Sequence, residues 1–128
     1  MIIDGKEISK SNILGKPVAK LLLDKNCTVT VCHSKTKDLT MYTKQADILV
    51  LAAGKINLIN GNMIKEGVIL IDACINVYQG NIYGDADFES VKDLCPYVTP
   101  VPGGVGPVTT AMILKNTLEA FKYAVKGA

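Results

Sequence analysis

Three short apolar runs, alternating with stretches of helical character, constrain the fold of this chain more than any other feature. The runs cover residues 27–32, 47–53 and 68–72, and they are rich in β-branched and large aliphatic side chains. Such runs are typical of strands that are buried on both faces of a parallel sheet. Parallel neighbours need crossover connections, so the alternation predicts βαβ units. We therefore expect an α/β fold, a Rossmann-like, doubly wound and mostly parallel sheet in three αβα layers.

The stretches between the runs predict the helices. One helix is expected to begin at Lys16 or Pro17, because proline suits the first helical turn and a leucine-rich body follows. Shorter helical pieces are expected at residues 39–45, 63–65 and 88–94, and a C-terminal helix at residues 108–126.

Two segments depart from this alternation. Short apolar runs flank Gln79-Gly80, which predicts a small hairpin over residues 77–83 at the rim of the sheet. The first strand is also unusual, because Lys6 and Glu7 stand where a buried central strand would be apolar. Residues 1–8 are therefore expected to form an irregular or edge-like strand, or a damaged one.

Composition excludes several classes of protein. The chain has 128 residues, of which 48% are hydrophobic and 20% charged, and this predicts one globular domain over residues 1–128. A net charge of +2 supplies no basic stripe, so no nucleic-acid partner is expected. No apolar run is long enough to span a bilayer, and no basic segment followed by an apolar one opens the chain. We therefore expect no membrane association and a cytoplasmic location.

The cysteines suggest neither a metal centre nor disulfides. Cys27, Cys32, Cys74 and Cys95 form no CxxC pair, and His33 is the only histidine. This set offers too few soft ligands for a zinc site, so no metal is expected. Buried, reduced thiols are the favoured interpretation of all four cysteines.

Two loops have the composition of ligand-binding segments. Residues 99–109 are rich in proline and glycine, which predicts a rigid, exposed loop rather than a linker, because proline fixes φ and glycine lets the backbone approach a ligand closely. The second loop, residues 9–17, places small hydroxyl residues, Lys10 and Gly15 before a helix. Such a loop either binds phosphate or only caps the helix.

These loops resemble segments of the bifunctional methylenetetrahydrofolate dehydrogenase/cyclohydrolase family. Residues 100–107 read PVPGGVGP, the signature of that family, and residues 9–17 match its GRSxxVGxP pattern at Ser11, Gly15 and Pro17. Further blocks stand in the family's order and near its spacing, at residues 32–36, 46–50, 54–55, 71–72, 75–76 and 84–88. The likeness covers nearly the whole chain and implies the C-terminal NAD(P)-binding domain of that family.

The resemblance implies a set of cofactor-binding residues. These are Ser9, Lys10, Ser11, His33, Ser34 and Ile75. Lys10, His33 and Ser34 would meet a 2′-phosphate, and Ile75 would lie against the nicotinamide. The acid that NAD-specific folds often carry after the second strand is absent, so NADP is expected, with NAD as the alternative. His33 also fits a plain surface imidazole, and Lys10 a solvated charge.

The resemblance also implies how the chain takes part in a reaction. In the family, the loop that matches Pro102, Gly103 and Gly104 reaches the folate and the cofactor. The family's enzymes transfer a hydride from the methylene carbon of the folate to the nicotinamide and then hydrolyse the methenyl bridge. The catalytic lysine belongs to a Tyr-x-x-x-Lys motif in an N-terminal domain, and no tyrosine of this chain has a lysine four residues later. We therefore expect a dinucleotide-binding half without catalytic residues, which meets folate only together with that missing domain.

Two substitutions leave another interpretation open. Ser9 replaces a glycine of the phosphate loop, and Cys74 replaces the glycine before Ile75. The added bulk also fits a truncated or drifted binding or regulatory module that keeps the fold and has lost cofactor affinity. Cys74 equally fits a small core residue, and Asp72 and Asn76 are expected to hold the end of their strand together. A flavodoxin-like receiver is disfavoured, because it would need acids clustered at the strand ends.

The C-terminal helix carries a broad apolar stripe. Its members are Val108, Ala111, Met112, Leu118, Phe121 and Val125. In the family this helix runs toward the N-terminal domain, so the resemblance implies a stripe without its usual cover. Exposed apolar area promotes association, so one hypothesis is a homodimer, or an exchange of this helix between two copies.

Overall fold

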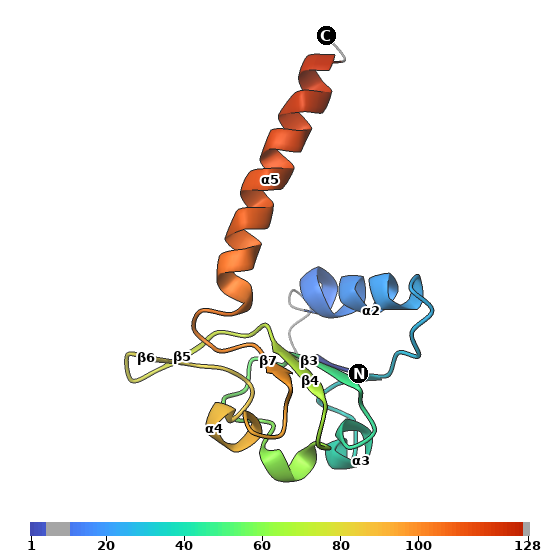
Figure 1. Cartoon of the computed structure of the whole chain (residues 1–128), viewed down its shortest axis with the longest axis vertical. Helices are drawn as coiled ribbons and strands as arrows, with labels where there is room; N and C mark the ends of the chain where they lie inside the picture. Colours follow the sequence, from blue (N-terminus) through green and yellow to red (C-terminus); the bar gives the residue numbers. More distant parts are fainter. Residues whose placement is uncertain (5–10, 127–128) are drawn as a thin grey trace.

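The computed structural model describes residues 1–4 and 11–126 of the chain. Within these ranges, a sheet of five parallel strands forms the centre, in the order β2-β1-β3-β4-β7 (Figure 1). The strands are β1 (Ile2–Asp4), β2 (Val31–Cys32), β3 (Ile48–Ala52), β4 (Ile69–Asp72) and β7 (Tyr97–Val98). The expected doubly wound, parallel α/β sheet is confirmed.

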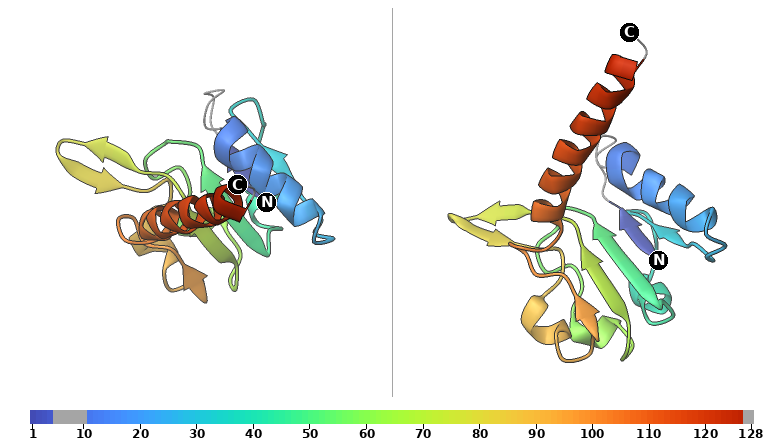
Figure 2. Two further views of the ribbon diagram at one scale, coloured as in Figure 1. Left: turned by 90° about the horizontal axis from the view of Figure 1, so that it is seen from above. Right: turned by 45° about the horizontal axis from the view of Figure 1, so that its top comes forward.

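Helices lie on both faces of this sheet (Figures 1 and 2). One face carries α2 (Lys16–Leu23), which follows the π-helical turn η1 (Ser11–Gly15). The opposite face carries α3 (Leu39–Thr43), the 3-10 turn η2 (Gly61–Met63) and α4 (Phe88–Val91). The expected start of α2 at Lys16 is confirmed. The short helices α3 and α4 end earlier than expected. The helical piece expected at residues 63–65 is wrong except at Met63, which ends the turn η2.

The main core lies between the sheet and the face that carries α3 and α4. Side chains alternate along β3, so Leu49 and Leu51 point into this core, where they join Leu70 and Val91. The opposite face is less completely covered, because α2 lies near one side of the sheet only (Figure 2). Accordingly, Tyr97 on the edge strand β7 is 71% exposed.

The first strand corrects one expectation. β1 lies between β2 and β3, so it is a central strand and not an edge-like one. Ile2 is fully buried, as a central position requires. β1 is described as far as Asp4, and Lys6 and Glu7 lie outside the described residues.

The second strand is shorter than expected and changes the interpretation of one cysteine. Of the run at residues 27–32, only Val31–Cys32 pairs as a strand, because β2 is the sheet edge and has β1 as its single neighbour. Cys27 therefore lies in the connection after α2, where its backbone N–H donates to the carbonyl of Leu22. Cys27 is exposed, so the expectation that all four thiols are buried is wrong for this one.

The hairpin at the rim is confirmed. β5 (Asn76–Tyr78) pairs with β6 (Asn81–Tyr83) in antiparallel register. The turn residues Gln79 and Gly80 have φ values of 50° and 79°. A two-residue hairpin turn with both φ values positive matches the right-handed twist of the strands, and this explains why glycine occupies the second position.

The last helix, α5 (Val105–Lys126), extends away from the sheet (Figure 1). It begins earlier than the expected residue 108, since proline is tolerated in a first helical turn and the end of the proline- and glycine-rich loop joins the helix. No residue of α5 is buried, and the stripe residues Leu118 and Phe121 are 53% and 63% exposed. The expectation that this stripe lacks cover within the chain is confirmed.

Candidate functional site

The strand order places a candidate site at one edge of the sheet. The described strands of the sheet are parallel, so their carboxyl ends share this edge. The chain passes from β1 outward to β2 and then returns to β3 on the other side of β1. Ligands of open α/β sheets bind outside the carboxyl ends of the strands, at the point where the strand order reverses. The carboxyl ends of β1 and β3 flank that point.

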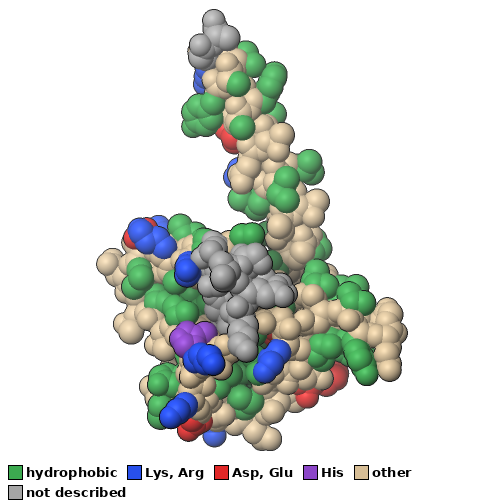
Figure 3. All heavy atoms as spheres, turned by 180° about the vertical axis from the view of Figure 1, so that it is seen from behind, with side chains coloured by type: hydrophobic (Ala, Val, Ile, Leu, Met, Phe, Trp, Pro, Cys, Tyr) green, Lys and Arg blue, Asp and Glu red, His purple; other side chains and the backbone are tan. Residues whose placement is uncertain are grey.

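The residues expected to meet a 2′-phosphate directly follow β2. His33 and Ser34 are both exposed there. The backbone N–H of His33 donates to Oγ1 of Thr36 over 2.9 Å, and Nδ1 of His33 accepts from the N–H of Lys35 over 3.1 Å. Nδ1 is therefore occupied by the backbone of its own turn. Figure 3 shows the histidine with lysine side chains beside it on this surface.

The phosphate-loop residues are described only in part. Ser9 and Lys10 lie outside the described residues. Ser11 opens the turn η1, which leads directly into the amino end of α2. Gly15 occupies the N-cap position of α2, so this helix has no side-chain cap.

Ile75 and the proline- and glycine-rich loop lie together on the other side of the candidate site. Ile75 follows β4 and is 59% exposed. Its Cδ1 lies 4.0 Å from the point that a Cβ on Gly106 would occupy, so it lies beside the first turn of α5. The loop with Pro102, Gly103 and Gly104 leads into this turn. Ile75 and the loop are therefore neighbours, whereas His33 and Ser34 lie beyond β3 and β1.

Gly103 and Gly104 occupy positions in the loop where a residue with a side chain would not fit. Gly103 has a φ of 102°, a conformation that other residues rarely adopt. A Cβ on Gly104 would lie 2.4 Å from the carbonyl oxygen of Pro100. The preceding residue, Pro102, is exposed and follows a cis peptide bond. This confirms an exposed loop whose shape depends on its glycines.

A buried carboxylate that the sequence did not reveal organises the loop after β3. Asp85 is fully buried, and its oxygens accept from the backbone N–H groups of Ala53, Gly54 and Lys55 over 2.6, 2.9 and 2.8 Å. Nδ2 of Asn76 donates to the same carboxylate over 2.9 Å. The expectation that Asn76 helps to hold the strand end is therefore confirmed. The one sequence signal for Asp85 was its place in the matching block at residues 84–88.

A second buried carboxylate holds the end of β4, as expected. Asp72 accepts from the N–H groups of Cys74 and Ala86 over 3.1 and 2.8 Å. Its own N–H donates to Oγ1 of Thr99, at the start of the proline- and glycine-rich loop. Burial raises the pKa of the Asp72 carboxyl, and the nearby Asp85 contributes in the same direction, while the two accepted hydrogen bonds oppose them.

Cys74 belongs to this buried cluster. It is 7% exposed and lies near the Asp85 carboxylate. Burial, with the negative charge of Asp85 as a further cause, raises the pKa of the Cys74 thiol to about 12. The thiol is therefore protonated at neutral pH and behaves as a small core residue, one of the two interpretations of the sequence. All four cysteines are free, and the described residues contain no group of side chains suited to hold a metal ion.

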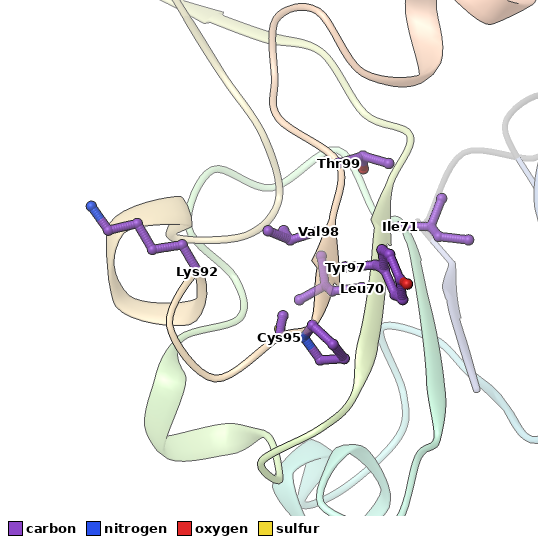
Figure 4. A pocket seen from close by; sticks show the side chains of 8 residues that line it. Leu70, Ile71, Lys92, Cys95, Tyr97, Val98 and Thr99 are labelled. Carbon is purple, nitrogen blue, oxygen red and sulfur yellow. The ribbon is translucent and has the colours of Figure 1, made fainter.

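A hollow of about 530 Å³ lies elsewhere, beside the edge strand β7. Its lining includes Leu70, Cys95 and Tyr97, while Lys92 projects from α4 away from them (Figure 4). None of the residues expected to bind cofactor or substrate lines this hollow. The candidate site is therefore the loop edge and not this hollow.

Comparisons with known proteins identify the family of this chain. Residues 3–125 match the model of the tetrahydrofolate dehydrogenase/cyclohydrolase, NAD(P)-binding domain, family. The chain is 79% identical over 128 residues to the bifunctional protein FolD of Caldanaerobacter subterraneus subsp. tengcongensis, covering 98% of this chain and 46% of that protein. It is 56% identical over 124 residues to the same protein of Halothermothrix orenii, covering 94% of this chain and 44% of that protein. The chain thus spans about half the length of these relatives.

Solved structures show the same likeness. The FolD enzyme of Campylobacter jejuni superposes with a TM-score of 0.88 at 51% identity, over 96% of this chain and 43% of that one. The Trypanosoma brucei enzyme, solved with NADP cofactor and inhibitor, superposes with a TM-score of 0.86 at 41% identity, over 97% of this chain and 43% of that one. The chain belongs to the tetrahydrofolate dehydrogenase/cyclohydrolase family and corresponds to its NAD(P)-binding domain.

Proposed function

We propose that this chain binds NADP at the loop edge of its sheet, as the dinucleotide-binding half of a 5,10-methylenetetrahydrofolate dehydrogenase/cyclohydrolase. The observation that carries the preference for NADP is the exposed turn after β2. Residues 33–37 of this turn contain a histidine, a serine and two lysines, but no acid. An acid at this point would hydrogen-bond the ribose of NAD and repel a 2′-phosphate, whereas cationic and hydroxyl groups favour the phosphate.

The remaining binding roles follow from the positions of the other residues. Ser9, Lys10 and Ser11 precede the amino end of α2 and are proposed to bind phosphate, with Lys10 also directed at the 2′-phosphate. Ile75 offers an exposed apolar side chain for the nicotinamide ring. The described residues thus fit the two ends of a dinucleotide, a polar end at β2 and an apolar end at Ile75. When bound, the nicotinamide supplies the hydride acceptor.

Folate is proposed to be a substrate of the larger enzyme and not of this chain alone. Pro102, Gly103 and Gly104 are the residues through which this half would reach it. No catalytic residue is proposed within the chain, so the isolated chain binds cofactor without turnover. We further propose that residues 1–128 act as one domain, located in the cytoplasm. As a separate finding, residues 1–4 and 11–126 contain no helix with the length and apolar character of a membrane span.

The proposal predicts that calorimetric titration of the chain gives tighter binding of NADP than of NAD, by about tenfold or more. A single substitution, Ser34→Asp, should remove this preference, because it places a negative charge beside the 2′-phosphate. The affinity for NAD should change by less than about threefold. Thr117→Asp adds the same charge on the exposed surface of α5 and should leave both affinities unchanged. Modest salt is needed, because ionic screening weakens exposed phosphate contacts.

The outcomes of this titration separate the two interpretations of the sequence. If the chain binds neither NADP nor NAD, it is a drifted module that has kept the fold and lost its cofactor. If Ser34→Asp and Thr117→Asp lower NADP affinity equally, the turn after β2 does not bind the 2′-phosphate. A dehydrogenase assay of the same preparation with methylenetetrahydrofolate should show no turnover above background.

We also propose that the isolated chain forms a homodimer through α5. The support is the exposed apolar stripe, which has no cover within the chain. Light scattering over a wide concentration range should show a dimer that the double change Leu118→Glu and Phe121→Glu converts to monomer. Asn116→Glu, an exposed position on the same helix, is the matched control. A monomer at every concentration for the unchanged chain would contradict the proposal.

A further inference from the structure

We infer that Asp85 is a positioning residue for the dinucleotide: it serves as an internal anion that fixes the loop after β3 and ties this loop to the segment that carries Ile75. This inference rests on the NADP site proposed above. Asp85 is fully buried, so it would act on the dinucleotide through the two loops that it joins.

Three consecutive backbone amides converge on this one carboxylate. Oδ2 of Asp85 accepts from Ala53 and Gly54, and Oδ1 accepts from Lys55. Gly54 has a φ of 68°, and this left-handed residue turns the neighbouring amides toward a common point. Consecutive amides in such a concave arrangement form an anion-binding nest. In this protein the nest is filled by a side chain of the chain itself.

The filled nest decides which loop is free to bind phosphate. The carboxyl ends of β1 and β3 flank the point where the strand order reverses. The three amides at residues 53–55 are committed to Asp85 and are therefore not available to a phosphate. We infer that this part of the loop contributes a fixed wall to the site rather than donors to the phosphates.

The same carboxylate joins this wall to the nicotinamide end of the site. Oδ1 of Asp85 also accepts from Nδ2 of Asn76, the residue after Ile75. Asp85 itself is held in place, because its carbonyl accepts from the N–H of Ile59 over 3.1 Å and the N–H of Ala86 donates to Asp72. A change at Asp85 should therefore move the loop after β3 and the segment of Ile75 together.

The contacts do not reach the other end of the cofactor. His33 and Ser34 follow β2, and β1 separates β2 from β3. None of the hydrogen bonds described for Asp85 involves β2 or the turn after it. Loss of Asp85 should therefore weaken the binding of the whole dinucleotide more than it weakens the binding of a fragment that carries only the 2′-phosphate end. A general loss of folding would weaken both alike.

The test is a calorimetric comparison of NADP with adenosine 2′,5′-bisphosphate, on the full chain and on Asp85→Asn. The amide of asparagine has only one acceptor oxygen, so its nitrogen would face backbone donors in either orientation. We expect Asp85→Asn to lower the affinity for NADP by at least about tenfold and the affinity for the bisphosphate by less than about threefold. Asp87→Asn is the matched control, because Asp87 makes no side-chain cap bond at α4, and it should bind like the unchanged chain.

A second variant covers the case in which Asp85→Asn does not fold. Asn76→Ala removes one hydrogen bond to Asp85 and leaves the three backbone amides of the nest in place. It should lower the affinity for NADP by about three- to tenfold and leave the affinity for the bisphosphate unchanged. The inference is overturned if Asp85→Asn retains NADP affinity, or if Asn76→Ala leaves it unchanged when Asp85→Asn is unfolded. Failure of the unchanged chain to bind either ligand would instead overturn the proposed NADP site, and this inference with it.

Discussion

Gly84→Ala is expected to destabilise the fold by about 4 kcal/mol. A Cβ at this position would lie 2.2 Å from Oδ2 of Asp72 and 3.2 Å from Cγ2 of Val101. Asp72 cannot move aside cheaply, because its carboxylate is buried and holds the amides of Cys74 and Ala86. The substitution therefore either breaks these hydrogen bonds or shifts the end of β4.

Urea denaturation of Gly84→Ala and the unchanged chain measures this effect. The expected result is a lower midpoint with an unchanged slope, which reports a loss of stability without a change in the surface exposed on unfolding. Gly106→Ala is the matched control, since its Cβ would meet one atom at 4.0 Å and its φ is not positive. That control should be neutral or stabilising, because alanine favours helix over glycine. Equal midpoints for Gly84→Ala and the unchanged chain would contradict the prediction.

Leu51→Ala should cost about 3 kcal/mol of folding free energy. Leu51 is fully buried on β3, the strand between β1 and β4, and belongs to the core under α3 and α4. Its truncation removes apolar contacts and leaves a cavity that a strand held on both sides cannot close. The free energy of unfolding from denaturant titration measures this cost.

A leucine on the surface provides the comparison. Leu114→Ala removes the same atoms from a side chain that is 69% exposed on α5, and it should change the free energy of unfolding by less than about 0.5 kcal/mol. If the two substitutions had equal effects at low protein concentration, the sheet face under α3 and α4 would not be the stabilising core.

Sequence pattern predicted the elements whose signals are local. The run at residues 47–53 became β3, the run at 68–72 became β4, and Gln79-Gly80 became the hairpin turn. These signals are intrinsic to a few neighbouring residues, namely the burial pattern of a strand and the positive φ values of a turn. The prediction was weaker where the length of a strand depends on its pairing partners. At residues 27–32 the strand lies at the sheet edge, and most of the apolar run is unpaired.

The candidate site divides in the same way. Exposed, motif-bearing positions such as Ser34 and Pro102 were available from the sequence, because their residue types match a known family. Asp85 was not, since its role depends on amides more than 29 residues earlier in the chain, and no local pattern reveals which carboxylate will fill a backbone nest. Its importance follows from burial and geometry alone.

The sequence by itself determined the parallel α/β class, the family and the loops that carry its motifs, because strand runs, turn residues and motif spacing are encoded within short segments. The tertiary structure decided three further points. β1 is a central strand and β2 an edge strand, and no residue of α5 is buried. The carboxylates of Asp85 and Asp72 accept hydrogen bonds from backbone amides of the loops at the carboxyl edge of the sheet. The physical reason is that strand pairing, burial and buried hydrogen bonds join residues far apart in the chain, and they exist only once the fold brings those residues into contact.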